Sequence, residues 1–554
     1  MGIDLFRIMP NYFWEPSHVV LLGFFLFLLI LQEKYQWNHK VLFGFVGFVS
    51  VGLSLYCFGP NLQAKWWLID DHEVFYLLKS KSNRNGIFDF FNVLFNQTEV
   101  GQFGNNPRYR ISYYSFRVLE ALIFKDNVFL WYFVWFFIST IFVFSIIYFL
   151  SKYFSLSVSV LFVLFVFSIR YWSDIFSRLG AGETYAVLGF ALILIGFSEY
   201  KWKEDNSVWI YVLISIGVLI CSGSKENFLP LFLIPLAQLV FEKRTRKSWS
   251  RLSVLILPIF LSVFTILSLY LFFKKSSVDI YGNSTRLSDR FSILFGKLEN
   301  GFVINLLILL LFLLLLYFFE YRKTKKNPVT SVAILPILFL GMLLLNIVFY
   351  NGVWPTNSRY DFPGMIFYQG AFFVLIFLLL RRLFGLYEAE SRDGNFYLNV
   401  VLILFLSSVT SVKGITDLQR DARANMKRTK AFTSFLNDLI ADKSDRVLIF
   451  YVHQAFDFEP VDAMTRFLNY YGDANDRMIQ VAEIKAESDF KNGLLNYMRT
   501  ISKEGSPDRK VIPFDQNRLK NRSCVLLFFP PATLQDVPDV GGCKELKKNI
   551  VPFQ

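Results

Sequence analysis

The sequence predicts an α-helical polytopic membrane protein with about 12 spans, followed by a C-terminal extracytoplasmic α/β domain. Hydrophobic residues make up 54% of the 554 residues, only 18% are charged, and the mean hydropathy is +0.41. Such a composition excludes an ordinary soluble chain. The 65 phenylalanines crowd into long apolar runs, and after Lys413 the composition becomes polar at once.

The apolar runs predict the spans, because a helix needs about 20 mostly apolar residues to cross a bilayer. Hydropathy places them at residues 18–32, 41–59, 127–150, 155–171, 183–199, 207–222, 227–241, 252–273, 301–320, 329–350, 364–380 and 396–412.

Basic residues in the short loops predict the orientation, because Lys and Arg are retained on the cytoplasmic side. The loops assigned to that side carry Lys34, Lys40, Lys152, Lys201, Lys203, Lys243–Arg251, Arg322–Lys326, Arg381 and Arg382. The outer face then receives the N-terminus, the long segment 60–126 and everything after residue 413. Topology accounts for the net charge of +13, so we expect no nucleic-acid partner.

We therefore expect a transmembrane domain over residues 1–413 and a soluble domain over residues 414–554. The second begins with an amphipathic helix at 418–442, and then strand-like runs at 446–452, 477–484 and 524–530 alternate with a helical stretch at 460–472. Two of the four cysteines, Cys524 and Cys543, lie here. A disulfide in an oxidising compartment and two buried free thiols are both consistent with them.

An acidic motif follows two tryptophans in the outer segment, where Asp70, Asp71 and Glu73 stand in WWLIDDHEVFYLL. Neighbouring carboxylates raise one another's proton affinity, so such a pair can act as a general base or hold a divalent cation. The alternative is the solvated acidic start of an amphipathic helix.

Further polar residues stand next to spans on the predicted outer face. Arg110 and Arg117 belong to an amphipathic stretch, where arginine suits either a ligand phosphate or lipid headgroups. Arg178 and Glu183 flank a turn with two glycines, which either admits a ligand or only shapes the turn.

Two more groups complete this set. Lys225 and Glu226 lie between two spans with almost no loop, where they either neutralise each other or bind an anionic ligand. Arg359 and Tyr360 stand at the start of a later span. Because all of these residues fall on the face opposite the topological Lys and Arg, we predict one site that opens outward.

These motifs together resemble GT-C-fold glycosyltransferases, and most nearly the bacterial Gtr-type O-antigen glycosyltransferases. The likeness covers most of residues 40–365 and rests on the aspartate pair, PRYRISYYSFRVLE, RLG-x-x-E, SKENF and RY-x-x-P. It does not cover the C-terminal domain. An extra span before the acidic loop departs from the enzymes in which that loop follows the first span.

The resemblance implies an inverting transfer from a polyprenyl-phosphate sugar to an extracytoplasmic glycan or protein, at the bacterial inner membrane among its lipids. Asp70 or Asp71 would be the general base, and Arg178, Lys225, Arg359 and Tyr360 would bind the donor phosphate. No metal site is expected from ligand spacing, although the acidic pair leaves a divalent cation open. The alternatives are a polymerase or ligase of lipid-linked glycans, and a transporter or flippase of lipid-linked sugars.

Overall fold

The structure is a computed structural model. It describes residues 16–35, 39–67, 71–79, 87–105, 109–200, 206–244, 253–275, 358–383, 392–442, 446–453, 457–471, 479–482, 511–537 and 540–552, together with single residues between 311 and 341.

Most of the described chain is helical, and ten of the twelve predicted spans coincide with described helices. These helices are α1 (Pro16–Tyr35), α2 (His39–Phe58), α6 (Val128–Ser151), α7 (Leu156–Phe167), α9 (Gly182–Glu199), α10 (Val208–Ser224), α11 (Leu233–Arg244), α13 (Ile256–Lys275), α18 (Gly364–Leu383) and α19 (Arg392–Val409). Apart from a few single residues, the predicted spans 301–320 and 329–350 lie outside the described residues, so the count of twelve stays a prediction.

Six of the described helices are long and apolar enough to cross a membrane, and a seventh is added if α19 and the following helix count as one bent span. Large apolar side chains on these helices face outward, such as Phe24 and Phe27 on α1 and Phe48 on α2, which is 76% exposed. Outward aromatic side chains of this kind fit a lipid environment. This part of the chain is therefore compatible with a polytopic membrane protein.

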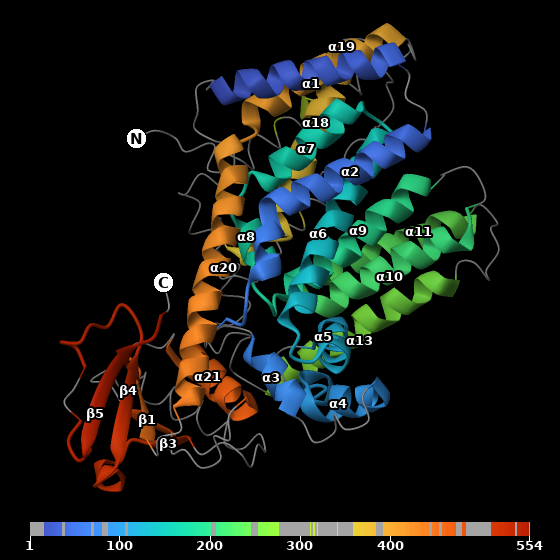
Figure 1. Ribbon diagram of the computed structural model, residues 1–554. Helices are drawn as coiled ribbons and strands as arrows, with labels where there is room; N and C mark the ends of the chain where they lie inside the picture. Colours follow the sequence, from blue (N-terminus) through green and yellow to red (C-terminus); the bar gives the residue numbers. More distant parts are fainter. Residues whose placement is uncertain are drawn as a thin grey trace.

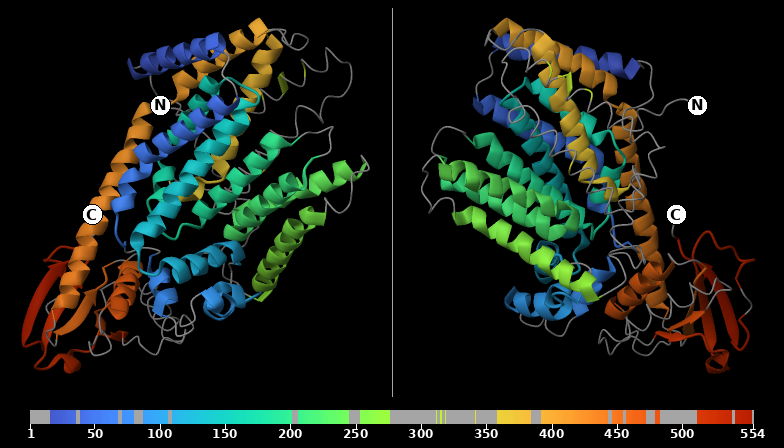
Figure 2. Two further views of the ribbon diagram at one scale, coloured as in Figure 1. Left: turned by 45° about the vertical axis from the view of Figure 1, so that its right-hand side comes forward. Right: turned by 180° about the vertical axis from the view of Figure 1, so that it is seen from behind.

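Short helices occupy the predicted outer segment. They are η1 (Gly59–Gln63), α3 (His72–Lys79), α4 (Phe90–Gln97), η3 (Glu99–Gly101) and α5 (Ile111–Phe124). Figures 1 and 2 show α3 and α4 at the same end of the helix bundle as the C-terminal domain. The two regions that the sequence assigns to one face of the membrane thus lie together.

Helix α20 (Val412–Ala441) connects the bundle to the C-terminal domain. It meets α19 at a bend of 54° and packs against α2, η1 and the short helix α8 (Tyr171–Phe176). Its charged residues make it a poor span, and its buried stripe includes Leu418, Phe432 and Leu436. The predicted amphipathic helix is therefore present, but it lies along the bundle (Figure 1).

The C-terminal domain contains a five-stranded parallel sheet in the order β3-β2-β1-β4-β5. The strands are β1 (Arg446–Tyr451), β2 (Ile479–Ala482), β3 (Val511–Pro513), β4 (Ser523–Phe528) and β5 (Glu545–Ile550). β1, β2 and β4 fall on the predicted runs, whereas β3 and β5 were not anticipated. β5 is polar because it forms an edge of the sheet.

A disulfide links two parts of this domain, and one of its helices packs against the bundle. A disulfide joins Cys524 to Cys543, with an S–S distance of 2.06 Å, so the disulfide alternative is the one the structure contains. Helix α21 (Phe458–Tyr471) packs against α3, where the ring centroids of Phe467 and Phe75 are 5.2 Å apart. The domain therefore contacts the helix that follows the acidic motif.

Candidate active site

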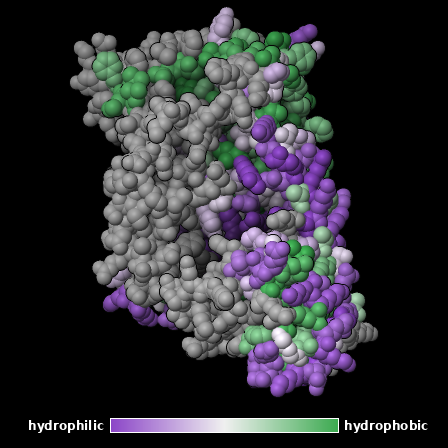
Figure 3. Space-filling view, turned by 90° about the vertical axis from the view of Figure 1, so that its left-hand side faces the viewer, coloured by the Kyte–Doolittle hydropathy of each residue, from purple (hydrophilic) through white to green (hydrophobic). Residues whose placement is uncertain are grey.

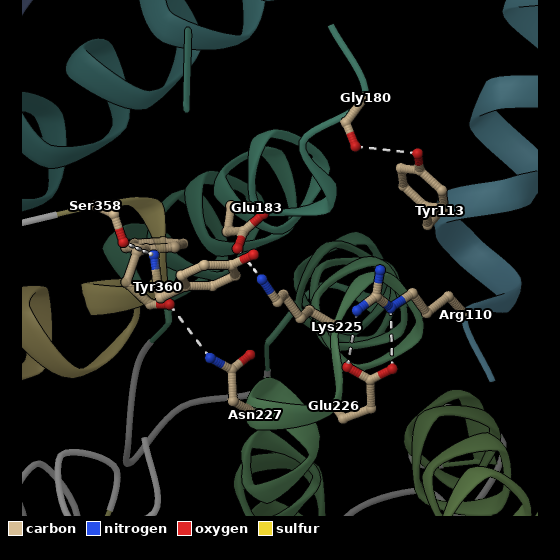
Figure 4. Close-up of polar contacts among 10 residues, drawn as sticks. Arg110, Tyr113, Gly180, Glu183, Lys225, Glu226, Asn227, Ser358 and Tyr360 are labelled. Atoms are coloured by element: carbon tan, nitrogen blue, oxygen red, sulfur yellow. Dashed lines mark hydrogen bonds and ion pairs between the residues drawn. The ribbon is translucent and has the colours of Figure 1, made fainter. Parts of the chain in front are cut away.

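The centre of the candidate site is a buried ion pair between Lys225 and Glu183 (Figure 4). Glu183 is in the first turn of α9, and Lys225 follows the last residue of α10, so helix ends supply both side chains. A Cβ at Gly182 would lie 2.9 Å from the carbonyl oxygen of Ser224. Glycine at that position therefore allows the two helix ends to meet closely.

Arg110 forms the second ion pair, with Glu226. Its Nε donates to Oε1 at 2.9 Å and its Nη2 donates to Oε2 at 3.3 Å, a paired geometry that suits guanidinium and carboxylate. Lys225 and Glu226 thus form ion pairs with different partners, Glu183 and Arg110. Adjacent residues in an extended connection point apart, which separates the two side chains.

Arg359 and Tyr360 come from η6 (Arg359–Asp361), which precedes α18. The ammonium Nζ of Lys225 lies 4.7 Å from the centroid of the Tyr360 ring, and the guanidinium of Arg359 lies 5.6 Å from it. Burial lowers the pKa of Lys225, Glu183 raises it, and Arg110 and Arg359 lower it further. Lys225 therefore interacts with two further cations, Arg110 and Arg359.

Tyr113 of α5 ties the acidic helix α3 to this cluster. Its hydroxyl oxygen lies 2.6 Å from Oε2 of Glu73 and 3.0 Å from the carbonyl oxygen of Gly180, which has a φ of 95°. The turn before α9, the basic stretch and the acidic helix thus meet at one hydroxyl, and Figure 4 shows the contact of this hydroxyl with Gly180. Sequence reasoning missed Tyr113, although it stands inside the quoted stretch PRYRISYYSFRVLE.

The aspartate pair is placed differently. Asp70 lies outside the described residues. Asp71 is fully buried, and its Oδ2 accepts a hydrogen bond from the backbone N–H of Trp67 at 2.5 Å. Asp71 also lies close enough to Tyr132 to interact with it electrostatically. Glu73, the next acidic residue of the motif, is hydrogen-bonded to Tyr113.

Two predicted arginines lie apart from the Lys225 cluster. Arg117 is fully buried in α5, with its guanidinium 5.1 Å from the ring of Trp131. Arg178 approaches Asp174, its Nη2 lying 3.8 Å from Oδ1, while its backbone oxygen accepts a hydrogen bond from Trp135. The structure therefore brings together only some of the residues that were predicted to form the outer site.

The arrangement brings three cations together with acidic groups. Lys225 and Arg359 both face Glu183, and Arg110 interacts with Glu226 and Glu99. Asn227, another residue that sequence reasoning missed, donates to the carbonyl oxygen of Phe362 at 3.2 Å and so anchors η6 against η4 (Glu226–Phe232). In this position the cluster can bind an anionic group and stabilise negative charge that develops on it.

Within the described part of the chain, no three His, Cys, Asp or Glu side chains gather closely enough to hold a metal ion.

Comparisons of the chain with protein-family models, with curated proteins and with solved structures found no match.

Proposed function

We propose that the protein is an inverting glycosyltransferase of the bacterial inner membrane. It moves a sugar from a polyprenyl-phosphate donor to a glycan or protein acceptor on the outer face. The observation that carries the proposal is the cluster of Lys225, Arg110, Arg359 and Tyr360 around Glu183. Lys225 and Arg359 both face Glu183, and a lysine and an arginine together suit the oxygens of a phosphate diester.

The reaction needs a base and a stabilised leaving group. Asp70 or Asp71 takes the proton of the acceptor hydroxyl, whose oxygen attacks the anomeric carbon of the donor sugar. The bond between that carbon and the phosphate oxygen breaks, and polyprenyl phosphate leaves with the electron pair. Lys225 and Arg359 stabilise the second negative charge that the leaving phosphate acquires. Attack from the opposite side inverts the anomeric centre.

The disulfide between Cys524 and Cys543 supports an oxidising compartment for the C-terminal domain. That domain packs on the helix after the acidic motif, which supports placing both on the same, outer face. A periplasmic or cytoplasmic reporter fused after Gln554 tests this topology. Activity of the cytoplasmic reporter would contradict it.

The catalytic proposal is tested by reconstituting the full chain with polyprenyl-phosphate sugars labelled in the sugar. Asp70→Asn, Asp71→Asn and Glu73→Gln are compared separately. Removing the base lowers kcat by about 100-fold or more, since general-base catalysis contributes at least that much. Asp126→Asn is the matched control, because Asp126 is an exposed carboxylate in the same segment.

Two outcomes contradict different parts of the proposal. If the wild-type chain releases no sugar from any polyprenyl-phosphate donor, the glycosyltransferase function is wrong. If transfer occurs and both Asp70→Asn and Asp71→Asn keep it while folded, the assignment of the base is wrong. A loss confined to Glu73→Gln would move the base to the carboxylate beside Tyr113.

A further inference from the structure

Arg428 of α20 lies in a setting that suits an anion. Its guanidinium is 4.6 Å from the ring centroid of Trp67, so one face is covered by an aromatic ring. Its Nη2 reaches Asn425 Oδ1 at only 3.5 Å, and its Nε is buried with no hydrogen-bond partner among the described residues. Arg428 is half-buried, and a buried Nε whose donor is unused is unfavourable unless a ligand completes it.

Arg178 brings a second positive charge to the same place. Burial lowers the pKa of Arg428, and Arg178 contributes the largest electrostatic effect in the same direction. Since arginine stays charged in proteins, a lowered pKa means that the surroundings disfavour the charge it carries. Asn61 links the two segments, because its Nδ2 donates to Oγ of Ser177, next to Arg178, at 2.9 Å, and its Oδ1 accepts from Nδ2 of Asn425, one turn before Arg428, at 3.0 Å. The two guanidinium groups, about 250 residues apart in the sequence, thus come from segments that lie side by side, and their charges repel each other.

Nearby carboxylates offset this repulsion only in part. Asp421 interacts with Arg428, but its Oδ2 is engaged by Nε of Arg170 at 3.1 Å. Asp174 is 3.8 Å from Nη2 of Arg178, beyond hydrogen-bonding distance. Figure 3 shows the side of the molecule on which α20 lies, where hydrophilic residues border part of a hollow. The two arginines therefore retain donors for a further partner.

We propose that Arg178 and Arg428 form a phosphate-binding site between the turn before α9 and α20, separate from the cluster around Lys225. Two guanidinium forks match the several oxygens of a phosphate group better than a single carboxylate, because each fork can donate two parallel hydrogen bonds. Trp67 holds one fork in place by covering its face. The site does not depend on the glycosyltransferase function.

The phosphate has two sources, a polyprenyl phosphate lipid or free phosphate, and two probes distinguish them. The full chain is purified in a maltoside detergent, which carries no phosphate, and titrated with inorganic phosphate and with undecaprenyl phosphate that lacks a sugar. Equilibrium binding and thermal unfolding are measured for the wild type, Arg428→Gln, Arg428→Lys and Arg178→Gln. Arg423→Gln is the control, because Arg423 is an exposed arginine on the same helix.

We expect Arg428→Gln and Arg178→Gln each to weaken binding at least tenfold, Arg428→Lys to lie between them and the wild type, and Arg423→Gln to bind within twofold of the wild type. Binding of undecaprenyl phosphate alone assigns a lipid-borne phosphate, and binding of both probes assigns the phosphate group itself. Because Arg178 is partly exposed, Arg178→Gln keeps the test valid should Arg428→Gln fail to fold.

The proposal is overturned if the wild type binds neither probe, or if folded Arg428→Gln and Arg178→Gln bind as tightly as the wild type. Sugar transfer measured on the same preparations separates the two proposals. Arg428-dependent binding without transfer would refute the glycosyltransferase alone, whereas transfer with unchanged binding would refute the phosphate site alone.

Discussion

The two charged clusters of this molecule differ in how their charges are balanced. In the bundle, Lys225 pairs with Glu183 and Arg110 pairs with Glu226, and all four side chains are at most 12% exposed. At the junction with α20, Arg178 and Arg428 are like charges, and the acids around them are distant or already engaged. In the first cluster these four charges form two ion pairs, whereas at the junction the two arginines have donors left over.

Because of this difference, we expect the paired charges of the bundle to contribute mainly to stability and the like charges at the junction mainly to binding. A buried pair is sensitive to loss of one partner, because the other charge is then left without water or a counter-ion. A pair of like charges is already unfavourable, so removing one relieves repulsion while removing binding capacity. We therefore expect the two clusters to respond in different ways to similar substitutions.

The largest expected effect is in the bundle. Lys225→Met leaves Glu183 buried and unpaired, so the free energy of unfolding falls by about 3 to 5 kcal/mol. The double variant Lys225→Met/Glu183→Gln regains much of that loss. Lys152→Met is the control, because Lys152 pairs with Glu199 at 3.1 Å in a partly exposed site, where a change below about 1 kcal/mol is expected. Unfolding in detergent measures all three variants.

The next effect tests whether packing, rather than charge, holds the C-terminal domain on the bundle. Phe467 is 2% exposed and packs on Phe75 of α3, so Phe467→Ala lowers stability by about 3 kcal/mol. Hydrogen exchange of the α3 amides then becomes faster. Tyr397→Ala, at a side chain that is 63% exposed, leaves exchange in α3 unchanged. Unchanged exchange in both variants would show that the contact does not position α3.

A third test concerns Glu120 of α5, a buried carboxylate that is hydrogen-bonded to a tyrosine. Burial raises the pKa of Glu120 from 4.5 to about 7, while its Oε2 accepts a hydrogen bond from the Tyr185 hydroxyl. The folded state therefore binds this proton more tightly than the unfolded state, and its contribution to stability is lost as the pH rises from about 4.5 to 7. Glu120→Gln removes that slope, whereas Glu545→Gln on the exposed edge of the sheet keeps it.

The smallest effect is at the junction. Without ligand, Arg428→Gln changes the free energy of unfolding by less than about 1 kcal/mol, since relief from Arg178 offsets the lost contact with Trp67. Unfolding measured beside Lys225→Met decides the comparison. A loss of stability in Arg428→Gln as large as the loss in Lys225→Met would mean that the charge of Arg428, like that of Lys225, is balanced by partners within the protein.

Local pattern was enough to predict much of the fold. Apolar length predicts α1, α2 and α6, and the amphipathic pattern predicts α20, because these signals depend on neighbours along the chain. Short β-branched runs likewise predict β1 and β4. The polar edge strand β5 carries no such signal, since its pairing with β4 depends on the rest of the sheet.

The sequence by itself determined that the chain is rich in membrane-length helices, that a small α/β unit follows, and that charged residues recur beside the helix ends. Tertiary structure alone decided which charges meet. Lys225 forms an ion pair with Glu183, which is distant in the sequence. Arg428 approaches Arg178 from a helix about 250 residues further along the chain. Hydropathy is a property of consecutive residues, whereas electrostatic partners are set by the distance in space that packing imposes.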